Sequence, residues 1–285
     1  MILVTGATGT VGGYLVQQLC GQSHPVRALV RSQEKADSLR GYDCETAIGS
    51  YEDAPSLHRA LEGVDRLFLL SAGGEQMAEQ ELVMVRAVQR AHAQVRVVKL
   101  AAAGVDGPGD SRFLRGHSTA IQALKEAGIA TTVLAPSSFM QNFLMWAGSV
   151  QEQGSFFLPA GDAAISHVDA RDVAAVAAHV LTSEGHEGAT YTVTGPEAVT
   201  YQQVAQTLSS LLDKPVQYVD VPPAAAREAM TGGAVPEWVA DGLLELFEIY
   251  RSGAAAGVTD EVHKATGRPA RSVADFLHDH LSAYR

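Results

Sequence analysis

The chain is poor in cysteine, and this excludes two classes of site. Its 285 residues include only two cysteines, Cys20 and Cys44. Two cysteines cannot build a disulfide framework, and no CxxC pair or Cys/His cluster has the spacing of zinc ligands. We therefore expect no metal site. Cys20 ends the apolar face of a predicted helix, and we expect its thiol to be buried.

Positive charge is also scarce. The chain has 21 lysines and arginines against 32 acidic residues, a formal net charge of −11. Nucleic-acid binding depends mainly on Lys and Arg neutralising phosphates, so we expect no nucleic-acid partner. No basic cluster stands out beyond Arg112 and Arg115.

Long apolar runs are missing as well. No stretch approaches the ~18 apolar residues of a membrane-spanning helix. The chain opens with the strand-like segment 1–5 and without the basic, apolar pattern of a signal peptide. We expect no membrane partner and a cytoplasmic location.

Apolar runs of strand length alternate with helical patterns through the first half of the chain. Val11, Leu15 and Leu19 form one helical stripe. The predicted strands are 2–5, 26–30, 45–48, 66–70, 95–100 and 130–134. Such alternation predicts an α/β fold, a Rossmann-type doubly wound parallel sheet. Most of these strands are apolar throughout, as in a sheet covered on both faces.

After Pro136 the elements become shorter and less regular. A helix is predicted over 169–181, with Asp169 as N-cap and Asp172 completing a start that resembles a capping box. A helix over 200–212 and strands over 191–194 and 216–221 follow. We expect two parts: a dinucleotide-binding domain over 1–150 and a smaller, mostly helical substrate lobe over 151–285. The boundary is not clean, since an element near 189–194 is expected to return to the main sheet.

A glycine-rich loop follows the first strand and opens the first helix. Its seven residues are Gly6, Ala7, Thr8, Gly9, Thr10, Val11 and Gly12. The first glycine allows a tight turn, the second close approach of a pyrophosphate, and the third close helix packing. The helix N-terminus then offers free N–H groups to phosphate. Strand, loop, helix and second strand in this order predict a dinucleotide site.

The end of the second strand indicates which dinucleotide. NAD-specific sites usually place Asp or Glu there, whereas this strand ends in Arg31, with Lys35 a turn later. A guanidinium and an ammonium suit a 2′-phosphate, so NADP(H) is the expected cofactor. The alternative is that both are solvated surface charges.

With these residues in hand, the chain resembles the NmrA-like atypical short-chain dehydrogenases/reductases, and within them the NADPH-dependent quinone oxidoreductases. The resemblance covers nearly the whole chain. It rests on Thr5–Gly12 (TGATGxxG), Val30–Ser32, Gly49–Asp53 with Ser56–Leu57, Gly63–Asp65, Gly128–Asn142, Thr194–Ala198, and Thr259–Asp260 with Thr266–Pro269.

The chain departs from this pattern at three places. Ser50 stands where the family usually has Asp, and Ala135 replaces the usual Arg before Pro136. The Tyr-x-x-x-Lys pair of ordinary short-chain dehydrogenases is missing, since none of the eight tyrosines has a lysine four residues later. The standard machinery for protonating an isolated carbonyl is therefore absent. A quinone or enone delocalises the charge that hydride transfer creates, and it needs only a weak donor.

The resemblance places a frequent His at His117, near the start of the helix after the fifth strand, and makes it the candidate catalytic donor. A helix N-terminus would keep it neutral; the alternative is an exposed residue near a helix cap. Ser71, after the fourth strand, lies at the edge where ligands bind in open α/β sheets. Pro136 and Phe139 are expected at the cofactor. Met140 and Phe143 are expected to line the substrate pocket, although plain core packing accounts equally for their spacing.

The sequence leaves two functional classes open. One is an NADPH-dependent reductase of a quinone or other conjugated carbonyl. The other is a catalytically silent NADP(H)-sensing regulator that binds a partner protein. Apolar residues within 238–247 suit a pocket roof or a subunit contact, so a homodimer stays possible. A sugar-nucleotide epimerase is disfavoured, because its chemistry also uses the missing Tyr/Lys pair.

Overall fold

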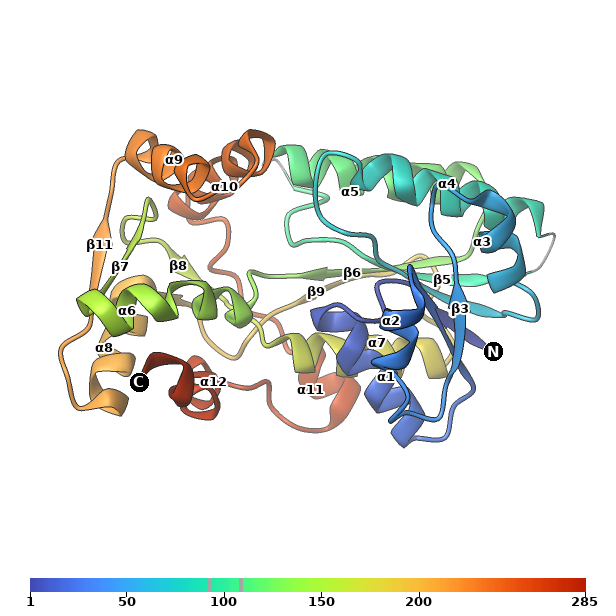
Figure 1. Ribbon diagram of the computed structural model, residues 1–285, viewed down its shortest axis with the longest axis horizontal. Helices are drawn as coiled ribbons and strands as arrows, with labels where there is room; N and C mark the ends of the chain where they lie inside the picture. The colour runs from blue at the N-terminus through green and yellow to red at the C-terminus, as the bar shows by residue number, and fades with distance from the viewer. Residues whose placement is uncertain (92–93, 108–109) are drawn as a thin grey trace.

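The computed structural model describes residues 1–91, 94–107 and 110–285. A parallel sheet of seven strands forms its centre, in the order β3-β2-β1-β4-β5-β6-β9 (Figure 1). The chain reverses its direction of winding between β1 and β4, which is where ligands bind in such sheets. The strands are β1 (Ile2–Val4), β2 (Val26–Val30), β3 (Glu45–Ile48), β4 (Arg66–Leu69), β5 (Arg96–Leu100), β6 (Thr131–Pro136) and β9 (Thr190–Val193).

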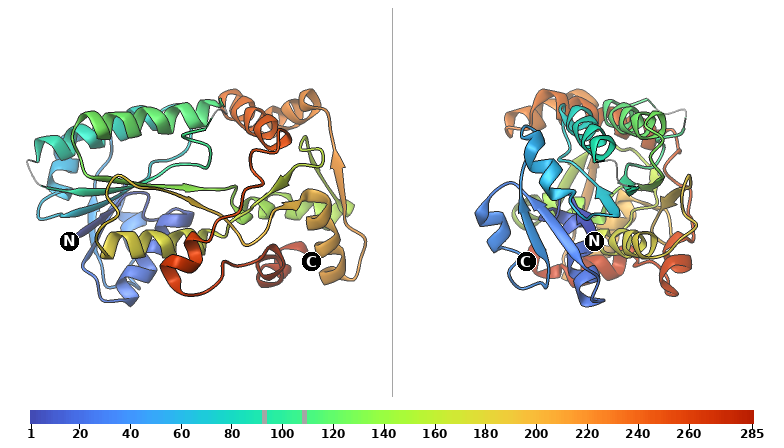
Figure 2. Two further views of the ribbon diagram at one scale, coloured as in Figure 1. Left: turned by 180° about the vertical axis from the view of Figure 1, so that it is seen from behind. Right: turned by 90° about the vertical axis from the view of Figure 1, so that its right-hand side faces the viewer.

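Helices cover both faces of this sheet, as Figures 1 and 2 show. One face carries α3 (Ala54–Ala60), α4 (Met77–Arg90) and α5 (Arg112–Glu126). The other carries α1 (Thr10–Gly21), α7 (Ala170–Thr182) and α11 (Glu261–Thr266). The short α2 (Gln33–Asp37) follows β2. A separate apolar core fills the space under each set of helices. The predicted Rossmann-type α/β fold is confirmed.

The remaining elements form a smaller lobe around a third, largely aromatic core. Two small sheets contribute to it, since β7 pairs with β11 in parallel and β8 with β10 antiparallel. The lobe contains η1 (Met140–Trp146), α6 (Ala147–Gln153), β7 (Ser155–Leu158), β8 (Ala164–Ile165), β10 (Val199–Thr200), α8 (Tyr201–Leu212), β11 (Gln217–Asp220), α9 (Pro223–Gly232), α10 (Glu237–Arg251), α12 (Val273–Asp279) and η2 (Leu281–Tyr284).

The apolar cores do not divide at residue 150. Helix α7 packs on α1 in the core of the main sheet, and β9 pairs with β6 as the seventh strand. In the other direction, Met140, Phe143 and Val150 belong to the lobe core. The division into 1–150 and 151–285 stays a prediction, and the chain crosses it several times.

The start of α7 differs in part from its predicted form. Asp169 is the N-cap, and its carboxylate accepts from the backbone N–H of Arg171 at 2.8 Å. The capping box is wrong. Asp172 turns to the segment before α12, where its carboxylate accepts from the backbone N–H of Arg271 at 2.7 Å and pairs with the Arg271 guanidinium. Burial raises the pKa of Asp172. Its charged form therefore depends on the pairing with Arg271.

Cys20 is half-buried at the end of α1, not fully buried as predicted. Burial, together with the neighbouring Cys44, raises its pKa to about 11. It is therefore a protonated thiol at neutral pH. Among the described residues, no helix is both long and apolar enough to cross a membrane. The same part of the chain contains no cluster of His, Cys, Asp or Glu that could hold a metal ion.

The Asp172–Arg271 pair should contribute measurably to stability. Arg271→Met leaves a buried carboxylate without its partner, so we expect the free energy of unfolding to fall by about 3 kcal/mol. Denaturant titration measures this. Arg59→Met is the matched control, because Arg59 and Asp53 form an exposed pair at 4.0 Å, whose loss should cost under ~1 kcal/mol. Equal effects of the two substitutions would contradict the role of Arg271.

Candidate coenzyme and active site

The glycine loop between β1 and α1 has a geometry that only glycine permits at two positions. Gly6 has a positive φ of +62°, a conformation that side chains disfavour. A Cβ atom at Gly12 would lie 2.1 Å from the carbonyl oxygen of Gly6. Gly12 therefore lets α1 pack directly on the loop. The backbone N–H of Gly9 donates to that same carbonyl at 2.9 Å, which holds the loop closed.

The N-terminus of α1 is open to a ligand. Its N-cap, Gly9, has no side chain to satisfy the first N–H groups, and no acidic residue lies in the first turn. Thr8 and Thr10 are exposed, while Ala7 and Val11 are buried beneath them. An uncapped helix end of this kind binds phosphate. The loop therefore fits the pyrophosphate of a dinucleotide.

Arg31 directly follows β2 and Lys35 lies in α2, and both side chains are exposed. Within the described ranges neither takes part in an ion pair. The pKa of Glu52 is lowered, mainly by a hydrogen bond from Ser50 and in smaller part by the charge of Arg31. Arg31 therefore lies near the loop that follows β3. These cations are available to a 2′-phosphate, and their contact with one stays a prediction.

A buried polar network lies under the carboxyl ends of β4 and β5. Lys99, on β5, has no exposed surface, and its Nζ lies 2.9 Å from Oε1 of Glu81 on α4. The same Glu81 oxygen accepts from Ser71 at 3.1 Å. Lys99 Nζ also contacts the carbonyl of Leu100 and lies 3.1 Å from Nδ1 of His117. Four side chains from two strand ends and two helices thus form one chain of contacts.

The network adjoins the glycine loop. Thr5, just before Gly6, donates its hydroxyl to the carbonyl of Leu70 at 2.8 Å and accepts from the Leu70 N–H at 2.8 Å. Ser71 is the next residue. It is buried and lies at the switch point between β1 and β4. The structure therefore places Ser71 next to the expected dinucleotide site, as the sequence argument requires.

His117 is half-buried in α5, facing Lys99. Its pKa is lowered to about 3, first by burial and second by the charge of Lys99. The neutral state of His117 was expected, but the expected cause, the field of the helix N-terminus, was wrong. Helix α5 begins at Arg112, so His117 lies in the second turn, where the field of the helix N-terminus has largely decayed.

The four residues expected after β6 fall into two environments. Pro136 is buried at the end of the strand, and Phe139 packs half-exposed against the core under α1 and α7. Met140 and Phe143 have no exposed surface and lie in the lobe core. The ring of Phe143 contacts His167 with centroids 4.8 Å apart. Packing accounts for Met140 and Phe143, and their role at a substrate stays a prediction.

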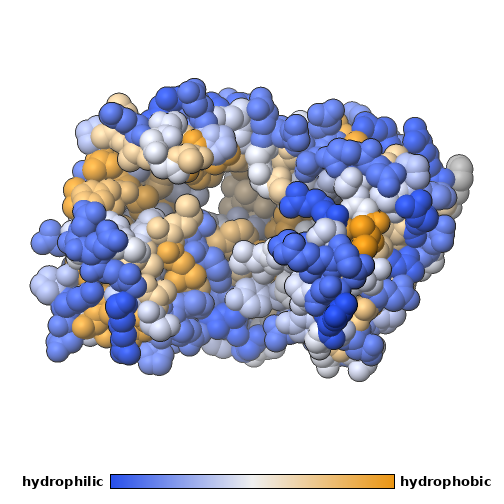
Figure 3. Space-filling model, in the orientation of Figure 1, coloured by the Kyte–Doolittle hydropathy of each residue, from blue (hydrophilic) through white to orange (hydrophobic). Residues whose placement is uncertain are grey.

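The lobe closes over this edge of the sheet through α10. Arg112, at the start of α5, donates to Glu245 of α10 at 2.8 and 3.0 Å. Gly242 allows the close approach, because a Cβ there would lie 2.6 Å from the ring of Phe113. Figure 3 shows a hollow beside α10, with apolar surface along part of its wall. The start of α5, which carries His117, lies next to this contact.

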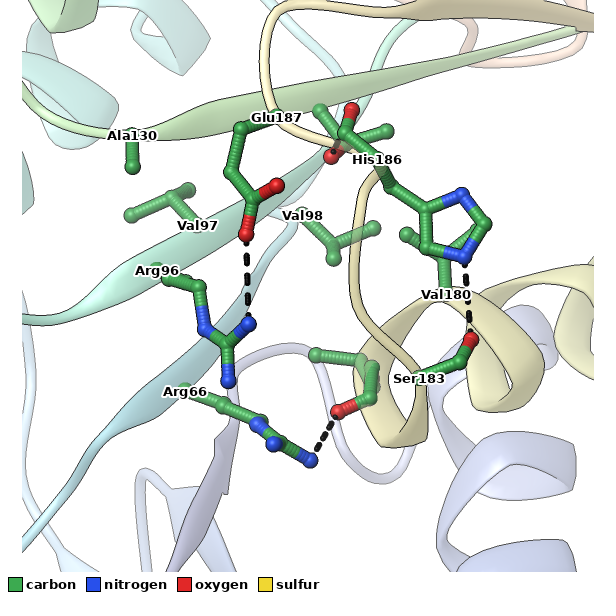
Figure 4. A pocket seen from close by; sticks show the side chains of 11 residues that line it. Arg66, Arg96, Val97, Val98, Ala130, Val180, Ser183, His186 and Glu187 are labelled. Atoms are coloured by element: carbon green, nitrogen blue, oxygen red, sulfur yellow. Dashed lines mark hydrogen bonds and ion pairs between the residues drawn. The ribbon is translucent and has the colours of Figure 1, made fainter.

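The cavity in Figure 4 lies elsewhere. Arg66, Arg96 and His186 are among its lining residues, at the opposite edge of the sheet from the glycine loop. Its volume is about 20 Å³, room for about one water. The Arg66 guanidinium donates to the carbonyl of Leu181 there, and Arg96 pairs with Glu187 at 3.1 Å. These contacts join α7 to the sheet and give no ligand site.

Sequence reasoning missed Lys99 and Glu81. Glu81 is fully buried in α4, although it lies in a helix whose other acidic residue, Glu79, is in the first turn. A signal was present, since Lys99 interrupts the apolar strand 96–100 at a position that faces the core. A buried lysine requires an acceptor.

Comparison with known proteins places this geometry in a family. Residues 1–277 match the NmrA-like family, and the chain belongs to it. It is 38% identical to the NAD(P)H azoreductase of Xenophilus azovorans, covering all of this chain and 99% of that protein. It is also 38% identical to the (4-alkanoyl-5-oxo-2,5-dihydrofuran-3-yl)methyl phosphate reductase of Streptomyces griseus, with the same coverage.

Among solved structures, the chain is similar to an NADPH-dependent quinone oxidoreductase of Escherichia coli in complex with NADPH. The TM-score is 0.91 at 29% identity, over 99% of this chain and all of that one. The chain is an oxidoreductase of the NAD(P)H-dependent type, and NADP(H) is the coenzyme that its loop fits.

The loop geometry makes a specific prediction. Gly12→Ala forces a Cβ against the Gly6 carbonyl, so the loop must open, and we expect NADPH affinity to fall at least about tenfold. Fluorescence titration with NADPH measures this. Gly13→Ala is the control, because a Cβ there would lie an ordinary 3.8 Å from its nearest neighbour. Undiminished NADPH binding by the Gly12 variant would show that the loop does not hold the coenzyme.

Proposed function

We propose that the chain is an NADPH-dependent reductase that transfers hydride to a quinone or another conjugated carbonyl acceptor. The observation that carries the proposal is His117, a neutral imidazole at the carboxyl edge of the sheet. Lys99 and Glu81 connect it to Ser71, which adjoins the glycine loop. Its ring can donate a hydrogen bond at neutral pH, but it holds no proton that it would release as an acid.

The chain's residues divide between holding the coenzyme and serving the acceptor. The loop 6–12 binds the pyrophosphate, Arg31 and Lys35 bind the 2′-phosphate, and Ser71, Pro136 and Phe139 position the nicotinamide half. NADPH, when bound, supplies the hydride. His117 donates to the acceptor oxygen on which negative charge collects. Met140 and Phe143 shape the lobe side of the pocket.

A weak donor selects the acceptor class. Reduction of an isolated ketone creates a strongly basic alkoxide, which needs a real acid. A quinone or enone spreads the charge over its conjugated system, and a hydrogen bond suffices. The names of the relatives agree, since an azo group, a quinone and the unsaturated, carbonyl-substituted dihydrofuranone ring are all conjugated acceptors. A cytoplasmic location, a homodimer and the lack of a nucleic-acid partner stand beside this as proposals.

The acceptor class is tested by anaerobic NADPH consumption with a panel of small quinones. Simple ketones, NADH and a reaction without acceptor are the controls. We expect turnover with quinones, little with ketones and little with NADH. Arg31→Ser should lose at least about tenfold of the preference for NADPH, while the exposed Arg40→Ser should keep it.

Two results of that assay would contradict the proposed function. Ketones reduced as fast as quinones would contradict the argument from a weak donor. No turnover with any acceptor, despite tight NADP(H) binding, would favour the other class, an NADP(H)-sensing regulator. A regulator should also bind the oxidised and reduced coenzyme with different affinities.

The state of His117 predicts a pH profile. Because its pKa is lowered to about 3, the neutral donor is fully populated above pH 5 and does not titrate between pH 5 and 8. We expect kcat for quinone to be flat across that range. An acid of pKa near 6.5 would instead lose activity as the pH rises. His117→Phe should lower kcat about 100-fold, and His117→Gln, whose amide keeps an N–H, should retain part of it.

A further inference from the structure

The three protons of the Lys99 ammonium match the three acceptors around it. Its Nζ faces Oε1 of Glu81, the carbonyl of Leu100 and Nδ1 of His117. An ammonium has three N–H donors and no lone pair. Nδ1 of His117 must therefore accept, and a neutral imidazole that accepts at Nδ1 carries its proton on Nε2.

The Nε2 atom of His117 is left for a ligand. No hydrogen bond joins it to any of the described residues. It is on the opposite side of the ring from Nδ1. The free N–H thus points away from Lys99.

We propose that Lys99 is a positioning residue for the reduction. It fixes His117 as the Nε2–H tautomer, so that the ring presents a hydrogen-bond donor to the substrate that accepts the hydride. Glu81 holds the ammonium in place, and Ser71 holds Glu81. The role of this donor in the reduction rests on the proposed function. The assignment of the tautomer does not.

The ammonium form of Lys99 depends on Glu81, because burial alone disfavours the charge. The charged and titratable groups that face the network are Glu81 on α4, His117 on α5 and Tyr51 after β3. Burial lowers the pKa of Lys99, and Glu81 opposes that shift. Burial raises the pKa of Tyr51, and the charge of Glu81 adds to the shift. The tyrosine therefore stays neutral. Among the described residues, Lys99 Nζ contacts no acceptor beyond Glu81, Leu100 and His117.

A network of this kind also explains how the site can work without a tyrosine that acts as an acid. Lys99 adds positive charge beside the imidazole and disfavours the imidazolium, which leaves a donor that is oriented but weakly acidic. The site is therefore built to stabilise a delocalised anion. The Tyr-x-x-x-Lys arrangement acts differently, since there a tyrosine hydroxyl is the acid.

Nitrogen NMR of the histidine rings tests the tautomer directly, without coenzyme or substrate. In ¹⁵N-histidine-labelled protein, His117 is assigned by loss of its signal in His117→Gln. We expect the Nε2–H tautomer in the wild type, unchanged from pH 8 to 5. The Nδ1–H tautomer or a charged ring at pH 7 would overturn the proposal with no variant needed.

A paired variant then isolates Lys99. Lys99→Met alone would leave Glu81 buried and unpaired, so the test uses Lys99→Met with Glu81→Gln, which removes both charges. Circular dichroism and NADPH binding check that it folds. We expect both tautomers of His117 to appear and its pKa to rise by about one unit or more. Exposed Lys125→Met, at the far end of α5, should change neither.

Kinetics complete the test. In the paired variant, kcat for quinone should fall about tenfold or more, with KM for NADPH unchanged. An unaltered tautomer and pKa in that variant, or a lower kcat without a tautomer change, would overturn the role of Lys99. A fixed Nε2–H tautomer in a protein that reduces no quinone would overturn the proposed function instead, and leave the role of Lys99 in setting the tautomer standing.

Discussion

A charged pair without access to water, Lys99 with Glu81, joins α4 to β5 beneath the carboxyl edge of the sheet. Removing two such charges from water costs several kcal/mol per ion, and only good geometry with further hydrogen bonds offsets this. Lys99 has three acceptors, and Glu81 accepts from both Lys99 and Ser71. The pair therefore favours one placement of α4 over β5, because sliding of this helix would separate Glu81 from Lys99.

That placement matters because the seven strands are parallel. Their carboxyl ends meet along one edge, so the glycine loop after β1, Ser71 after β4 and the start of α5 all lie there. The lobe is fixed to the same edge by Arg112 and Glu245. A ligand at this edge is thus bounded by a phosphate-binding helix end, a buried polar network and an apolar lobe. The rest of the sheet acts as a rigid support.

Local signals explain what could be predicted from the sequence. The strands of the main sheet are apolar runs bounded by turns, and their predicted ends fall within one or two residues of the observed ones. The glycine loop was found because its spacing is local. The capping box at Asp172 failed for the opposite reason, since its partner Arg271 lies 99 residues later. Strands β8 and β10 were missed because two residues carry no periodicity. The four-residue β7 was missed as well.

The residues around the candidate donor show the same limit. His117 was proposed through resemblance, and its neutral state was expected, yet the cause lay in a lysine 18 residues away. The lysine in an apolar strand indicates that an acceptor is needed, but a single sequence does not reveal that this acceptor is Glu81, which lies 18 residues away in another element. The functional consequence follows from the pair. A buried ammonium that donates to an imidazole orients the ring and, through its charge, makes the neutral ring a weaker base. It lowers the affinity of Nδ1 for a proton and thereby commits Nε2–H to hydrogen bonding. Such a donor stabilises an anion whose charge is already spread, and it is of little use to a localised alkoxide. The missing Tyr-x-x-x-Lys pair and the buried lysine, two separate features of the chain, therefore both support the proposed class of acceptor.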